Sequence, residues 1–102
     1  MTTQTAQIYD VGDLVALKVN FRVGTINTDP TAITLKVKNP IGLITLYTYG
    51  VASGLLRNAI GDYQFGLIVD TEGDWWYRWQ GTGSCVAAED RRLYVRDSVF
   101  IS

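Results

Sequence analysis

The chain has 102 residues, of which 47% are hydrophobic and 19% are charged, and its formal net charge is −1. This length fits one domain, and this composition excludes an intrinsically disordered chain. The near-neutral charge, with no basic run longer than Arg91-Arg92, argues against a nucleic-acid partner.

The N-terminal segment 1–8 is mostly polar or small, and we expect it to form a flexible arm. It lacks the basic and apolar regions of a signal peptide. No apolar run in the chain approaches the ~20 residues that cross a bilayer. The sequence therefore predicts no membrane partner.

Alternating apolar and polar residues predict a series of β-strands in the first half of the chain. The first strand covers residues 15–23, and the second covers residues 33–38. The residues at 39–42, Asn-Pro-Ile-Gly, are typical of a tight turn. A third strand at 43–49 is rich in β-forming residues, but either of its faces is a candidate for burial.

The second half continues the pattern with one uncertain stretch. Residues 50–60 are either a short helical turn or an irregular strand. A fourth strand at 63–69 is followed by a predicted hairpin loop at 71–74 and by an aromatic strand at 75–79. Residues 85–95 form a last pair of short strands or one bent strand.

These elements predict an all-β fold, an antiparallel immunoglobulin-like β-sandwich of about seven strands over residues 9–96, followed by a tail at 97–102. Cys85 is the one cysteine, so no disulfide can form within the chain. Tyr63 is either a tyrosine corner or an ordinary half-buried strand residue. The expected core is Val15, Leu17, Val19, Phe21, Ile33, Leu35, Val37, Tyr63, Phe65, Leu67, Trp75, Tyr77 and Trp79.

The residues needed for catalysis are largely missing. The chain has no histidine, which removes the commonest general base and every Ser-His-Asp or Cys-His arrangement. Asp70, Glu72 and Asp74 cluster in a predicted loop and are interpreted as turn caps, with weak calcium binding as the alternative. We therefore expect no enzymatic activity, no catalytic residues, no metal site and no cofactor.

One predicted strand contains all three tryptophans. Trp75, Tyr77 and Trp79 are two residues apart and share one face, while Trp76 and Arg78 share the other. The first set predicts packing in the core, with a platform for sugar rings as the alternative. Trp76 is predicted either to stack on a cation of a neighbouring strand or to anchor a protein interface.

Three apolar clusters lie near predicted loops or termini, where polar residues are usual. Such clusters are typical of partner surfaces, and a near-zero net charge favours association. The expected protein interface comprises Ile41, Leu43, Ile44, Leu55, Leu56, Trp76, Val99 and Phe100.

The chain carries, in order, YDVGD at 9–13, TLKVKNPIG at 34–42, YTYG at 47–50 and WWYRWQGTG at 75–83. In this order the segments resemble the small immunoglobulin-like virion structural proteins of tailed bacteriophages, over most of residues 9–96. The resemblance implies a non-enzymatic virion protein, made in the host cytoplasm. It also implies many copies per particle, bound to capsid, neck or tail proteins.

The chain departs from that resemblance at Ile41, Leu43, Ile44 and Leu46, which are apolar where relatives tend to be polar. The departure favours stable docking over loose display, as a capsid decoration or as a neck or tail accessory. The alternative is a carbohydrate- or host-surface-binding module that uses an exposed tryptophan.

Overall fold

The computed structural model describes residues 7–97, and within them the chain is all-β. That range contains no helix able to cross a membrane. Ten strands form where about seven are predicted. They are β1 (Gln7–Asp10), β2 (Leu14–Asn20), β3 (Arg22–Val23), β4 (Ile26–Asn27), β5 (Ala32–Lys38), β6 (Ile44–Thr48), β7 (Leu55–Ala59), β8 (Asp62–Ile68), β9 (Gly73–Thr82) and β10 (Ala87–Arg96).

The additional strands come from two places that alternation alone does not resolve. β1 begins at Gln7, inside the segment predicted to be a flexible arm. The strand predicted at 15–23 ends at Asn20, and β3 pairs with β4 in a separate hairpin. The Phe21 N–H bonds to the Gly61 carbonyl (2.7 Å) at this bend, and Val23 beyond it is exposed rather than buried.

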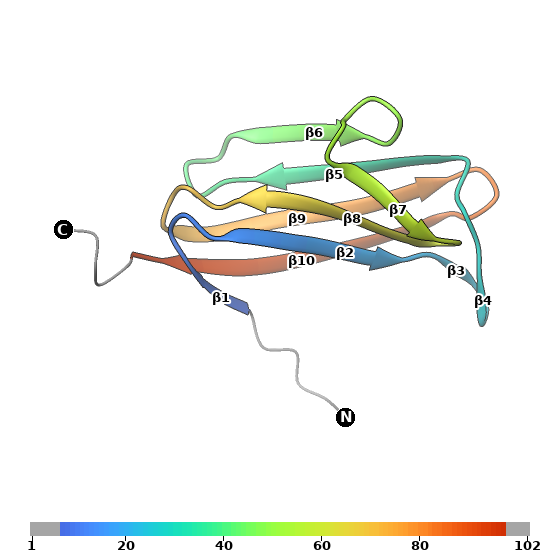
Figure 1. Cartoon of the computed structure of the whole chain (residues 1–102), viewed down its shortest axis with the longest axis horizontal. Coiled ribbons are helices and arrows are strands. Elements are labelled where there is room, and N and C mark those ends of the chain that lie inside the picture. The colour runs from blue at the N-terminus through green and yellow to red at the C-terminus, as the bar shows by residue number, and fades with distance from the viewer. Residues whose placement is uncertain (1–6, 98–102) are drawn as a thin grey trace.

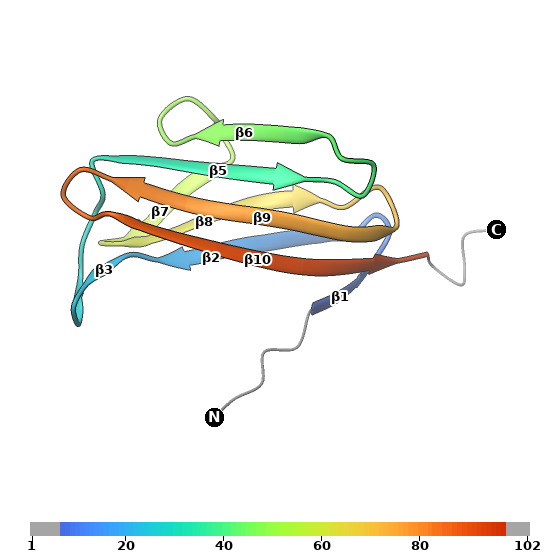
Figure 2. The ribbon, with the colours of Figure 1, turned by 180° about the vertical axis from the view of Figure 1, so that it is seen from behind.

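Two sheets form the body of the molecule, as Figures 1 and 2 show from opposite sides. The larger has the strand order β1-β10-β9-β5-β6, and the smaller has the order β2-β8-β7. β1 runs parallel to β10, and the other neighbouring strands are antiparallel. Residues 69–72 therefore carry the chain from one sheet to the other. The predicted hairpin loop at 71–74 is wrong, because β8 and β9 each bury an apolar face against the opposite sheet.

The hydrophobic core fills the space between the two sheets. Alternate residues of β2, β5 and β8 are buried, as the period of two in a strand requires. Every residue of the expected core is buried except Tyr77, which is half-buried and packs against the core. Tyr77 lies between Arg91 of β10 and the buried Val37 of β5.

The two buried indoles differ in their hydrogen bonding. Trp75 donates its Nε1–H to the Thr71 carbonyl (2.8 Å) in the connection between the sheets. Trp79 is completely buried, and within residues 7–97 its Nε1–H has no acceptor. Trp75 therefore fixes the connection as well as the core, whereas Trp79 contributes through packing alone.

Candidate docking surface

The hairpin between β5 and β6 is held by its own hydrogen bonds. The Gly42 N–H donates to the Asn39 carbonyl (3.0 Å), and the Leu43 N–H donates to the Asn39 side-chain oxygen (2.9 Å). Pro40 suits the second position of this turn, and Gly42 has a φ of 94°, which disfavours other residues. The turn therefore presents Ile41 at its tip in a defined position.

The apolar side chains of this hairpin point into solvent. Ile41 is 80% exposed, and Leu43, Ile44 and Leu46 each expose more than half of their surface. Residues 39–56 include no charged residue. Clustered apolar exposure of this kind marks interaction sites. We call Ile41, Leu43, Ile44 and Leu46 the docking surface.

Trp76 lies beside this surface on the outer face of β9. Its neighbours across the sheet are Lys38 of β5 and Arg92 of β10, and the Arg92 guanidinium carbon lies 5.5 Å from the indole centroid. Arg78, two residues along the same strand, instead forms an ion pair with Asp90 (3.1 Å). A shallow groove of about 260 Å³ is lined by Lys36, Lys38, Ile44, Trp76, Tyr77, Arg78 and Asp90. The structure thus brings Trp76 and Ile44 together.

Leu55 does not belong to the predicted interface, and that prediction is wrong. It is 3% exposed and lies opposite Phe65 of β8 in the core. β7 begins at Leu55, which is the one buried residue of this strand, and Leu56 next to it points to the opposite face. Leu56 is exposed on the outer side of the smaller sheet, away from the docking surface. The predicted interface residues Val99 and Phe100 lie outside the described residues.

The most closely bonded polar cluster lies at the other end of β5. The Asp29 carboxylate accepts hydrogen bonds from the Arg57 guanidinium (2.9 Å), the Gly61 N–H (2.8 Å) and the Tyr63 hydroxyl (2.9 Å). We call these four residues the Asp29 clamp. It ties the connection before β5 to β7 and β8. The Tyr63 hydroxyl bonds to a side chain here, whereas a tyrosine corner bonds to backbone.

The clamp changes the acidity of two of its members. The Arg57 guanidinium, followed by the Gly61 N–H, lowers the pKa of Asp29 to about 2. Burial, followed by the bond to Asp29, raises the pKa of Tyr63 to about 12. Both groups therefore hold one protonation state across the neutral range and have protein partners. We interpret the clamp as structural rather than reactive.

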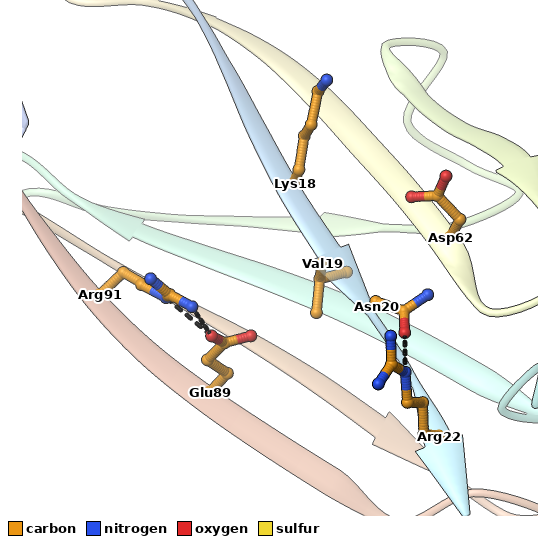
Figure 3. A pocket seen from close by; sticks show the side chains of 7 residues that line it. All are labelled: Lys18, Val19, Asn20, Arg22, Asp62, Glu89 and Arg91. Carbon is orange, nitrogen blue, oxygen red and sulfur yellow. Dashed lines mark hydrogen bonds and ion pairs between the residues drawn. The ribbon is translucent and has the colours of Figure 1, made fainter. Parts of the chain in front are cut away.

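A polar hollow of about 400 Å³ lies beside the free edge of β2 (Figure 3). Glu89 and Arg91 of β10 form an ion pair on one side of it, and Arg22 donates to the Asn20 side chain on the other. The remaining lining residues are Lys18, Val19 and Asp62. Its charges are of mixed sign and partly paired, so it does not select for one class of charged ligand.

The cysteine and two acidic residues near the start of the domain have partners within the fold. Cys85 is buried and its thiol donates to the Arg22 carbonyl (3.5 Å). Asp13 accepts the Asp10 N–H (2.9 Å), and Asp10 pairs with Arg96 (2.8 Å). In the part of the chain that the structure describes, no three His, Cys, Asp or Glu side chains could together hold a metal ion.

No protein-family model, no curated protein and no solved structure matches this chain. The candidate site therefore rests on geometry. Leu46, which the sequence already marked as unusually apolar, is exposed on the same hairpin. Val51 is 84% exposed, and the residue patterns did not include it in the predicted interface. The absence of charge from residue 39 to residue 56 is the signal that would have found it.

Proposed function

We propose that this protein is a non-enzymatic structural component of a tailed-phage virion, which docks on other virion proteins in many copies. The proposed fold type is the immunoglobulin-like sandwich. The strand order supports this fold type. Strands β2, β7 and β8 form one sheet in the order β2-β8-β7, and strands β5, β6, β9 and β10 form the other in the order β10-β9-β5-β6. β1 is added beside β10, and β3 and β4 form a separate hairpin. The virion assignment follows the resemblance of the ordered segments at 9–13, 34–42, 47–50 and 75–83.

One observation carries the docking proposal: the uncharged apolar docking surface on a sandwich whose core is complete without it. The core residues between the sheets are buried, whereas Ile41, Leu43, Ile44 and Leu46 are not needed to cover them. Burying these side chains against a partner gains roughly 25 cal/mol per Å² of apolar area. The fold itself loses little if they change, so their apolar character is best explained by a partner.

The test compares two equally exposed apolar residues at opposite ends of the sandwich. Ile41 is 80% exposed in the β5–β6 turn, and Val86 is 81% exposed in the β9–β10 connection. Ile41→Asp, alone and combined with Leu43→Asp, should abolish incorporation into virions. Val86→Asp should leave the copy number per particle unchanged, as measured by quantitative mass spectrometry of purified particles.

Normal incorporation of the doubly substituted protein would remove the proposed interface. Equal losses for Ile41→Asp and Val86→Asp would show that any added surface charge prevents assembly. Thermal unfolding of each variant separates these outcomes from a failure to fold.

A second candidate function is supported by Trp76, which is 47% exposed beside Lys38 and the groove. An exposed indole flanked by cations suits an acidic sugar, which stacks on the ring and pairs with an ammonium group. This module would bind a host-surface polysaccharide, and added acidic polysaccharide should shift the tryptophan fluorescence. The Trp76→Ala variant should lose that binding; an unchanged spectrum of the unmodified protein would rule the candidate out.

A further inference from the structure

Among the edge strands of the two main sheets, β6 is the one that has no protection against pairing within residues 7–97. β1 has four residues and ends in Asp10, and β7 has a register shift between Arg57 and Ala59. β2 carries Lys18 and borders the charged hollow of Figure 3. Short length, bulges and charges are the devices by which proteins prevent edge-to-edge pairing. β6 has none of them, since residues 44–48 are Ile-Thr-Leu-Tyr-Thr.

The hydrogen-bond pattern of the β5–β6 pair shows which backbone groups face this edge. The Asn39 N–H donates to the Leu43 carbonyl, and the Tyr49 N–H donates to the Ile33 carbonyl (3.0 Å each). In an antiparallel pair, hydrogen-bonded residue pairs alternate with pairs that are not bonded. Leu46, opposite Lys36, is three positions from both bonded residues. Its N–H and C=O therefore point away from β5 and, in the described residues, toward no other strand.

We propose that β6 pairs antiparallel with β6 of a second copy of this chain, with the two-fold axis at Leu46, to join two larger sheets into one. In this arrangement Leu46 exchanges both backbone hydrogen bonds with the partner's Leu46. The Thr48 N–H faces the carbonyl of the partner's Ile44. The Thr48 carbonyl already accepts the Val51 and Ala52 N–H groups (3.0 and 2.8 Å), so it needs no partner.

The β6 strand of a second copy is a better partner for this edge than a strand that carries charges or a bulge. The sequence of β6 is neutral, of matching length and apolar on its outer face at Ile44 and Leu46. The two-fold axis places Leu46 beside the partner's Leu46 and aligns two docking surfaces on one continuous face. The inference does not depend on a virion role, because the purified chain alone forms the contact. In a particle with many copies, high local concentration would strengthen it.

The association should be of moderate strength. A five-residue edge contact is smaller than the ~1,200 Å² total that stable complexes usually bury, so we expect dimers in the micromolar range. Sedimentation equilibrium of the full chain should show a reversible monomer–dimer exchange. A purely monomeric protein at about 0.5 mM overturns the proposal.

Charge substitutions at Leu46 test the position of the axis. In the Leu46→Glu variant, the new carboxylate lies opposite Lys36 of its own chain, which favours the fold. In the dimer it would also lie opposite the new carboxylate of the second copy, and the two would repel each other. This substitution should weaken dimerisation about 100-fold or more, as should Leu46→Lys. An equimolar mixture of the two variants should dimerise again, because opposite charges then meet at the axis. Leu56→Glu is the control on the outer side of the smaller sheet and should leave the dissociation constant unchanged.

Two further outcomes would overturn this arrangement. Dimers that survive Leu46→Glu are held by another surface. If both single variants lose the dimer and their mixture does not regain it, the contact has no two-fold axis at Leu46. Circular dichroism of each variant establishes that it is folded. Virion incorporation of Leu46→Glu is scored separately, so failure of self-pairing and failure of docking remain distinguishable.

Discussion

The two ends of strand β5 are built in opposite ways. Before its first residue, the Asp29 clamp joins three segments through a carboxylate that accepts from a guanidinium, an N–H and a hydroxyl. After its last residue, the turn at 39–42 closes with local hydrogen bonds and leaves Ile41 in solvent. One end therefore maintains the fold, and the other is free to bind.

This contrast teaches that stability and binding are separable in the molecule. Substitutions at the clamp end should lower the free energy of unfolding strongly, whereas substitutions of the exposed apolar side chains at the hairpin end should mainly change association. Four predictions examine the contrast, beginning with the largest effect.

The largest difference in unfolding free energy is expected between two glycine-to-alanine substitutions, one at each end of β5. Gly61→Ala would place a Cβ 2.4 Å from the Phe21 carbonyl oxygen, at a φ of 73°. It should cost about 3 kcal/mol or more, because strain adds to a backbone clash. Gly42→Ala has a φ of 94° but no atom within 4 Å of the new Cβ, and should cost about 1 kcal/mol. Urea unfolding measures both, and equal losses would contradict the contrast.

The next effect is that of a single hydroxyl. Tyr63→Phe removes the donor to Asp29 while keeping the buried ring, which stacks edge-on with Phe21 at 5.9 Å. A hydrogen bond to a charged group contributes about 1.5–3 kcal/mol, so the unfolding free energy should fall by about that amount. Tyr94→Phe, on a ring that is 41% exposed, is the matched control and should leave stability unchanged.

The clamp should also make stability sensitive to acid. The pKa of Asp29 lies at about 2 in the folded protein, below its ordinary value of 3.8. The folded state therefore favours the carboxylate. Its contribution is complete above pH 3.8 and is lost as the pH falls toward 2. Melting curves recorded from neutral pH down to about pH 2 test this. The Asp29→Asn variant should be less stable than the unmodified protein at neutral pH, and acidification should lower its melting temperature less. Parallel curves for both proteins would exclude Asp29 as the source.

The smallest effect is expected at the hairpin tip. Ile41→Asp should change the unfolding free energy by no more than about 0.5 kcal/mol, because the side chain is 80% exposed and does not belong to the hydrophobic core. Val86→Asp provides the comparison at similar exposure. A loss of several kcal/mol for Ile41→Asp alone would mean that the tip supports the fold and is not reserved for a partner.

The sequence predicted several strands well because alternation is a local property. The apolar residues of β2, β5 and β8 recur every second position, and each of these strands buries that face. Leu55 was misplaced for the opposite reason. A two-residue apolar run has no period, so only pairing with β8 decides which of Leu55 and Leu56 is buried.

The candidate site was predictable in part. The apolar turn at Ile41 and the exposed Trp76 follow from residue types at turn and strand positions. The cation beside Trp76 does not, because the register between β9 and β10 selects Arg92 and leaves Arg78 to Asp90. The edge position of β6 likewise depends on strand order, which short-range patterns do not encode.

The amino-acid sequence by itself determined the all-β class, the alternating buried faces and the uncharged stretch from 39 to 56, since each depends on near neighbours in the chain. The tertiary structure decided which strands pair, which edges stay open and which carboxylate holds Tyr63. These features join residues far apart in the chain, such as Asp29 and Tyr63. They form only when burial of the common core brings the two sheets together.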